Sequence, residues 1–217
     1  MGRAERLYPF GVIALRWLSL SAGAVVFATL AVELHTPWVG ALDERARAVA
    51  MGFRSDGLTD VMQVITFLGN GWSLGVVAAL VAGFEFFDRH RKVALFVVTA
   101  SVGAGLLNAL LKLLFARPRP DVALRLAAAG GYSFPSGHSM ASAAIVTTLM
   151  LVVIARRPRL RALAIVVGSA LIVAIGISRV YLGVHYASDV IAGWALGASW
   201  PLWLRPLLLV TSQSRGR

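Results

Sequence analysis

The chain has 217 residues, of which 58% are hydrophobic and 14% are charged. This balance excludes an ordinary soluble domain and indicates an integral membrane protein. The net charge of +11 does not indicate a nucleic-acid-binding protein, because the basic residues stand in short clusters between long apolar runs instead of gathering on one face. The sequence has no cysteine, which excludes disulfides, thiolate nucleophiles and cysteine-ligated metals.

Six apolar stretches are long enough to cross a bilayer, whose hydrocarbon core takes roughly 20 residues of helix. They cover residues 11–34, 58–87, 93–114, 138–155, 162–177 and 190–209. A cleaved signal peptide is the alternative for the first stretch, because Arg3 and Arg6 precede it, but its length and the internal Arg16 favour a retained anchor. With no internal repeat and only short connections, we predict one all-α domain over residues 1–217, a bundle of six transmembrane helices.

The connections between these stretches differ in charge. Basic residues are concentrated after the second and fourth stretches and at both termini, and positive loops stay in the cytoplasm. The two basic connections contain Arg89, Arg91, Lys92, Arg156, Arg157, Arg159 and Arg161. We therefore expect a protein of the bacterial inner membrane with both termini in the cytoplasm. The connections after the first, third and fifth stretches then share the periplasmic or extracellular side.

The first connection, residues 35–57, has the pattern of an amphipathic helix lying in the membrane interface. Its apolar face contains Leu42, Ala46, Val49, Ala50 and Phe53, and its polar face contains Asp43, Glu44, Arg47 and Arg54. Two roles are open for this helix: it caps the bundle, or it forms a gate for lipid entry.

Two glycine patterns interrupt the apolar stretches. Gly69, Asn70 and Gly71 break the second stretch and predict either a bend with close packing or part of a lipid groove. Gly193 and Gly197 have the GxxxG spacing of closely packed helices, for which we favour packing within the bundle. The oligomeric state is left open.

A first polar cluster follows the third stretch. Lys112 stands seven positions before Arg119, and Pro118 and Pro120 end the helix. Two cations are therefore held near the membrane surface, where they either bind an anion or, as the alternative, merely snorkel into solvent.

A second cluster, Phe134-Pro-Ser-Gly-His-Ser139, directly precedes the fourth stretch. The free amides of a helix N-terminus, with the Ser136 hydroxyl and a glycine that permits close approach at Gly137, predict a phosphate cradle with His138 beside it. The alternative is a simple N-cap next to an interfacial histidine.

The third cluster, residues 178–189, joins the fifth and sixth stretches. His185 and Asp189 are four positions apart, so on a helix they share a face and the carboxylate accepts from one ring nitrogen. The other nitrogen is then left free for nucleophilic attack. A plain surface pair of histidine and aspartate is the alternative.

Topology strengthens the functional interpretation of these clusters, because the third and fifth connections lie on the same side of the membrane. Three cations, two histidines, a carboxylate and a helix N-terminus provide what phosphoryl transfer without a metal ion requires. The predicted set is Lys112, Arg119, Ser136, His138, Arg179, His185 and Asp189.

At these residues the sequence resembles the type 2 phosphatidic acid phosphatase superfamily, whose signatures KxxxxxxRP, PSGH and SRxxxxxHxxxD all occur without substitution. The resemblance implies a phosphohistidine on His185, oriented by Asp189, with His138 as general acid and no metal or cofactor. It also implies that the phosphate is held by Lys112, Arg119, Ser136, Gly137 and Arg179. Arg117 and Tyr181 fall on variable positions of the signatures and receive no role.

The substrate is less constrained than the reaction, because the signatures recognise only the phosphate. Relatives implied by the resemblance act on phosphatidylglycerol phosphate, phosphatidic acid, diacylglycerol diphosphate, undecaprenyl diphosphate or lipid A. An outward-facing site favours undecaprenyl diphosphate together with glycerophospholipid phosphates. A lipid flippase or transporter with an anionic-headgroup site is the alternative from another class, whereas the six stretches argue against the soluble vanadate-binding haloperoxidases with a similar pocket.

Overall fold

The computed structural model describes residues 22–205, and this part of the chain contains helices and no strand. The all-α prediction is therefore confirmed. A helical segment over Ala22–Val32 leads into α2 (Pro37–Gly52), α3 (Asp56–Leu68), α4 (Gly71–Phe87) and α5 (Arg91–Phe115). The short 3-10 turn Val122–Leu124 precedes α6 (Gly137–Arg156), and a second one, Pro158–Leu160, precedes α7 (Arg161–Tyr181) and α8 (Ala187–Leu204).

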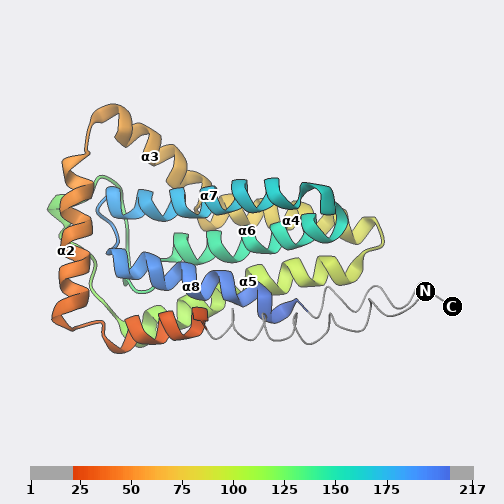
Figure 1. The fold of residues 1–217 in the computed structure, drawn as a ribbon, viewed down its shortest axis with the longest axis horizontal. Coiled ribbons are helices and arrows are strands. Elements are labelled where there is room, and N and C mark those ends of the chain that lie inside the picture. Colours follow the sequence, from red (N-terminus) through yellow and green to blue (C-terminus); the bar gives the residue numbers. More distant parts are fainter. Residues whose placement is uncertain (1–21, 206–217) are drawn as a thin grey trace.

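The helices α4 to α8 form an elongated bundle, and α2 lies across one end of it (Figure 1). Helix α6 occupies the centre, where it packs against α4, α5, α7 and α8. The contact with α8 is close, because a Cβ atom at Gly197 would stand 2.4 Å from the carbonyl oxygen of Met140. The GxxxG pattern therefore serves packing within the bundle, as predicted.

The second apolar stretch is a broken helix, with a bend of 43° between α3 and α4. Asn70 starts the new helix, since its side-chain oxygen accepts from the Ser73 amide at 2.7 Å. Gly69 lies against Ile175 of α7, at a distance that leaves no room for a Cβ atom. The predicted bend is confirmed, and so is close packing at Gly69, whereas a Cβ atom at Gly71 would have no heavy atom within 4 Å.

The outer surface of the bundle is apolar, as expected for contact with lipid. Four large apolar side chains on it are more than 60% exposed, namely Leu80, Leu106, Leu113 and Val166. Soluble monomers rarely expose a continuous apolar surface of this kind. Three helical segments are long and apolar enough to cross a membrane, namely Arg91–Phe115, Gly137–Arg156 and Pro158–Tyr181. Two bent pairs raise the number to five within residues 22–205.

The count of six spans remains a prediction, because residues 11–21 of the first stretch and 206–209 of the last lie outside the described residues. A helix is present in the first connection, and α2 turns by 100° from the segment before it. That α2 lies in a membrane interface also remains a prediction.

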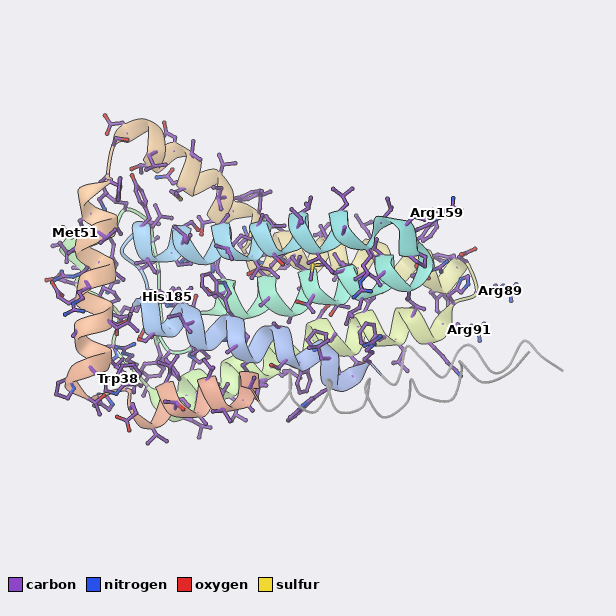
Figure 2. The ribbon with its side chains drawn as sticks, viewed as in Figure 1. Trp38, Met51, Arg89, Arg91, Arg159 and His185 are labelled. Carbon is purple, nitrogen blue, oxygen red and sulfur yellow. The ribbon has the colours of Figure 1, made fainter. Side chains whose placement is uncertain are left out.

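The two ends of the bundle carry different residues. His185 lies at the end crossed by α2, hereafter the α2 end, whereas Arg89, Arg91 and Arg159 lie at the opposite end (Figure 2). The third and fifth connections are therefore brought together at the α2 end, and the basic connections are together at the other.

Candidate functional site

The N-terminus of α6 forms the floor of the candidate site. Ser136 is the N-cap, and its hydroxyl accepts from Ser139 Oγ at 3.0 Å and from the Ser139 amide at 3.5 Å. Its own amide donates to the Asp189 carbonyl at 3.0 Å, which joins this turn to the start of α8. The first amides of α6 have no acceptor within the helix, a geometry suited to binding an anion.

Lys112 reaches this turn from the last part of α5. A Cβ atom placed on Gly137 would stand 3.8 Å from Lys112 Cε and 3.2 Å from Asn108 Oδ1, so the glycine permits the close approach. The Lys112 ammonium donates to the Tyr132 carbonyl at 2.5 Å. The cation predicted from the first cluster therefore lies beside the cradle predicted from the second.

His185 lies in the short connection between α7 and α8, where it is almost fully buried. Its Nδ1 is 3.2 Å from Asp189 Oδ2, and its Nε2 is 3.0 Å from Arg119 Nη1. A guanidinium can only donate, so Nε2 accepts and Nδ1 carries the proton that is donated to Asp189. The imidazole is thus a neutral tautomer whose lone pair is on Nε2, where it accepts from Arg119.

The geometry of this pair differs from the prediction in one respect. The spacing of four was interpreted as one turn of helix, but His185 precedes α8 and only Asp189 lies in its first turn. Asp189 caps that helix, because its Oδ2 also accepts from the Tyr186 amide at 3.0 Å. The contact between histidine and carboxylate is therefore made across a helix start.

Burial lowers the pKa of His185 to about 4, although hydrogen bonding to Asp189 acts in the opposite direction. The positive charges of Arg119 and Arg179 add to the lowering of this pKa. A histidine with so low a pKa is unprotonated at neutral pH, as a nucleophile must be.

Arg119 is held by the backbone around it. Its Nε donates to the carbonyls of Gly130 and Gly131 at 3.1 and 3.0 Å, and its Nη1 donates to the Val184 carbonyl at 2.8 Å. Arg119 is therefore fixed by three carbonyls from two loop segments while it faces Nε2 of His185.

Arg179 was expected in the connection, but it lies in the last turn of α7. It is buried, and one of its terminal nitrogens donates to Thr66 of α3. Among the described residues its buried Nε has no hydrogen-bond partner. An unsatisfied cationic donor of this kind is expected where an anion binds.

All of the predicted residues converge at the α2 end. His138 stands in the first turn of α6 within electrostatic range of Lys112, Arg119, Arg179 and His185. Within residues 22–205 there is no group of three or more histidine, aspartate or glutamate side chains that could hold a metal ion.

Residues 92–210 match the PAP2 superfamily. The chain belongs to this superfamily. Phosphatidylglycerophosphatase B of Bacillus subtilis strain 168 is 34% identical over 174 residues, which cover 79% of this chain and 85% of that protein. An undecaprenyl-diphosphatase of Sulfolobus acidocaldarius is 34% identical over 119 residues, which cover 52% of this chain and 54% of that protein.

The fold of this PAP2 protein is also similar to a solved structure. The first transmembrane PAP2-type phosphatidylglycerolphosphate phosphatase from Bacillus subtilis superposes with a TM-score of 0.83 and 30% identity, covering 91% of this chain and 99% of that one. Since the matched relatives are phosphatases, the prediction that the chain is a lipid phosphatase is confirmed at this level.

The sequence analysis of this PAP2 phosphatase assigned no role to Arg117, but the structure places it next to the site. It is buried, and its Nη1 donates to Asp189 Oδ1 at 2.6 Å while its Nη2 donates to Asp43 Oδ2 at 2.8 Å. Burial acts to lower the pKa of Arg117, but the carboxylates of Asp189 and Asp43 raise it above its usual value. The guanidinium also lies over the Tyr186 ring, 4.1 Å from its centre.

Asp43 was assigned to the polar face of α2, a face expected to meet the aqueous side of a membrane interface. It is instead 5% exposed and points into the protein. A polar helix face meets either water or buried polar groups, and periodicity cannot distinguish the two. The useful signal was Arg117 itself, because an arginine directly before Pro118 and two positions before Arg119 needs a carboxylate as its partner when it is buried.

Proposed function

We propose that this PAP2 phosphatase hydrolyses the phosphate of a membrane lipid monoester or diphosphate through a phosphohistidine on His185, without a metal ion. The observation that carries the proposal is the position of His185, with Nδ1 donating to Asp189 and the Nε2 lone pair held beside Arg119. A second histidine, His138, is subject to the charges of Lys112, Arg119 and Arg179.

In the first step, the substrate phosphate binds between Lys112, Arg119 and Arg179, with further donors from Ser136 and the Gly137 turn. His185 Nε2 attacks phosphorus, a P–N bond forms, and the P–O bond to the lipid breaks. His138 transfers a proton to the leaving oxygen. The fixed cations stabilise the charge on the equatorial oxygens of the transition state.

In the second step, water attacks the phosphohistidine. His138, now without its proton, takes one from the water, the P–N bond breaks, and inorganic phosphate leaves. Asp189 keeps accepting from Nδ1 throughout, so that the imidazole can carry the phosphoryl group and then release it as a neutral ring.

A lipid substrate is supported by an apolar hollow of about 590 Å³ beneath α2. Its walls come from α2, α3, α7 and α8, and include Leu42, Val49, Phe53, Met62, Ile177 and Trp194. Such a hollow suits a hydrocarbon chain whose headgroup enters the polar site, which favours the role of α2 in lipid entry. The relatives named above support undecaprenyl diphosphate and phosphatidylglycerol phosphate as substrates.

The proposed topology has six spans, cytoplasmic termini and the site on the periplasmic or extracellular side of the bacterial inner membrane. It is supported by the separation of His185 from the basic connections along the bundle. No nucleic acid takes part in this function.

The test is phosphate release by the purified protein in detergent, with undecaprenyl diphosphate, phosphatidylglycerol phosphate, phosphatidic acid, diacylglycerol diphosphate and lipid A, in buffer with EDTA. We expect release by the wild type and none by His185→Ala. No release from any lipid, unchanged release by His185→Ala, or a loss in EDTA that magnesium restores would contradict the proposal. Headgroup translocation in vesicles that survives in His185→Ala would favour a transporter.

A further inference from the structure

Four ionisable groups form a continuous buried chain at the α2 end. Asp43 contacts Arg117 at 2.8 Å, Arg117 contacts Asp189 at 2.6 Å, and Asp189 contacts His185 at 3.2 Å. Asp43 is 5% exposed, Arg117 9% and Asp189 0%. The proposed function uses the last two members, and gives Asp43 and Arg117 no contact with the phosphate.

The acceptor positions of Asp189 show what Arg117 does. Oδ2 is occupied by His185 Nδ1 and by the Tyr186 amide, whereas Oδ1 is occupied by Arg117. A carboxylate with only Oδ2 fixed can turn about its χ2 angle, which is a soft torsion. The bond to Oδ1 therefore sets the plane of the carboxylate and, through it, the direction of the imidazole.

Asp43 holds Arg117 in that position from a distant part of the sequence. Its Oδ2 accepts from Arg117 and from Ser188 Oγ, and its Oδ1 accepts from the Ser188 amide at 2.8 Å. The same carboxylate thus pairs with the arginine and caps the start of α8, the helix that carries Asp189. Loss of Asp43 would leave a buried guanidinium with half of its charge compensation.

The C-terminal end of α2 is fixed to the third connection and to the end of α7. Arg54, just beyond the helix, donates to the Leu124 carbonyl at 2.9 Å and to the Tyr181 carbonyl at 2.9 Å. The helix is therefore attached at two points by its polar face, while its apolar face lines the hollow beneath it. The position of α2 and the geometry of the site are connected through buried polar contacts.

We propose that Asp43 and Arg117 are positioning residues of the phosphatase, and that Asp43 of α2 holds Arg117 against Asp189 so that His185 is aligned for attack only when α2 is docked. This inference rests on the proposed role of His185. It makes α2 a part of the catalytic apparatus, in addition to its contact with the lipid.

The decisive comparison uses two isosteric changes on one helix. Asp43→Asn removes the buried carboxylate charge, and Glu44→Gln removes the neighbouring charge, which lies on the surface and pairs only with Arg47 among the described contacts. We expect Asp43→Asn to lower kcat about 10- to 100-fold, the range for second-layer contacts in well-studied sites, with KM within about twofold of wild type. Glu44→Gln should retain wild-type kcat and KM.

A purely structural role predicts a different pattern, in which activity falls only in proportion to the folded fraction. The melting temperature and the elution profile of each variant are therefore measured alongside kcat. Arg117→Lys serves as the second variant, because lysine reaches one carboxylate but not both, and its kcat should lie between those of wild type and Asp43→Asn.

A double variant that combines Asp43→Asn with a change in the site itself completes the test. Asp43→Asn added to Asp189→Asn should cause no further loss of kcat, because both changes act on the same alignment. Multiplicative losses, or an Asp43→Asn protein that is folded and as active as Glu44→Gln, would overturn the inference while leaving the phosphatase function intact. A wild type that releases no phosphate would instead overturn the proposed function.

Discussion

The two ends of this helical bundle use charge in opposite ways. At the α2 end, Asp43, Arg117 and Asp189 are buried and joined to one another. At the opposite end, Arg157, Arg159 and Arg161 are exposed. Burying a charge costs free energy unless it is paired, whereas exposed cations beside a membrane serve its topology. The comparison therefore separates charges that are positioned for chemistry from charges that orient the protein.

One partly buried ion pair at the opposite end provides the internal control for this comparison. Glu85 of α4 is buried and pairs with Arg156 of α6, with His90 and Asp88 beside it. This pair joins two helices and lies at the end of the bundle away from His185. The following predictions compare equivalent changes at the two ends, beginning with the largest expected effect.

Replacement of the two histidines should separate nucleophile from general acid. We expect His185→Ala to lose at least about 10⁴-fold in kcat, and His138→Ala to lose about 10²- to 10⁴-fold. An aryl phosphate whose leaving group needs no proton should restore the first step in His138→Ala, seen as a burst of released aryl alcohol, and leave His185→Ala without a burst. His90→Ala, at the opposite end, is the matched control and should remain active. Equal behaviour of the two site variants with the aryl substrate would contradict the assignment of roles.

Arginine replacement should have a smaller effect that again depends on the end of the bundle. Arg119→Lys cannot reproduce the contacts with three carbonyls and His185 Nε2, because lysine lacks the planar fork. We expect kcat/KM to fall about 10- to 100-fold. Arg159→Lys, on an exposed turn, should leave kcat/KM unchanged. Steady-state kinetics on one lipid in mixed micelles measure both variants. Equal losses of kcat/KM in the two would contradict the proposed difference between the two ends of the bundle.

The pH dependence of His185 tests the electrostatics of the site. Its pKa is lowered to about 4, whereas a histidine in an unfolded chain has a pKa of about 6.5. The unfolded chain therefore binds more protons between these values, so the contribution of neutral His185 to stability is complete above about pH 6.5 and declines as the pH falls toward 4.

The measurement is an NMR titration of the imidazole in the protein without substrate, with His185→Ala to assign the signal. The charged groups that face His185 are Asp189, Arg119 and Arg179. Because Arg119 opposes protonation, Arg119→Gln should raise the titration midpoint, and Arg159→Gln should leave it unchanged. A wild-type midpoint near 6.5 would show that His185 is not buried among cations in solution.

Much of the fold was predictable because lipid-facing helices leave a direct signal in the sequence. The apolar stretches 93–114 and 138–155 correspond closely to Arg91–Phe115 and Gly137–Arg156. The break at Gly69 was visible for the same reason, since glycine and asparagine interrupt an otherwise apolar run. Such features depend on local composition, which a single sequence displays.

The candidate site was predictable where residues at short spacing share one connection, as His185 and Asp189 do. The pairing of Arg117 with Asp43 was not, because 74 positions separate them and an amphipathic pattern does not say which medium its polar face meets. The bond from Arg179 to Thr66, across 113 positions, was hidden for the same reason. Contacts between distant segments require the packed structure.

The smallest predicted effect concerns the control pair at the opposite end. Glu85→Gln removes the charge that Arg156 and His90 face. Because Arg156 is partly exposed, we expect the free energy of unfolding to fall by about 1–3 kcal/mol, less than for a fully buried pair. Thermal unfolding should register this as a lower Tm, while kcat and KM stay at wild-type values.

Asp43→Asn should also lower Tm, but its kcat should fall as well. If Glu85→Gln reduced kcat as strongly as Asp43→Asn, the loss in both would reflect general destabilisation, and burial of a charge pair would no longer distinguish the α2 end as the part that aligns the nucleophile.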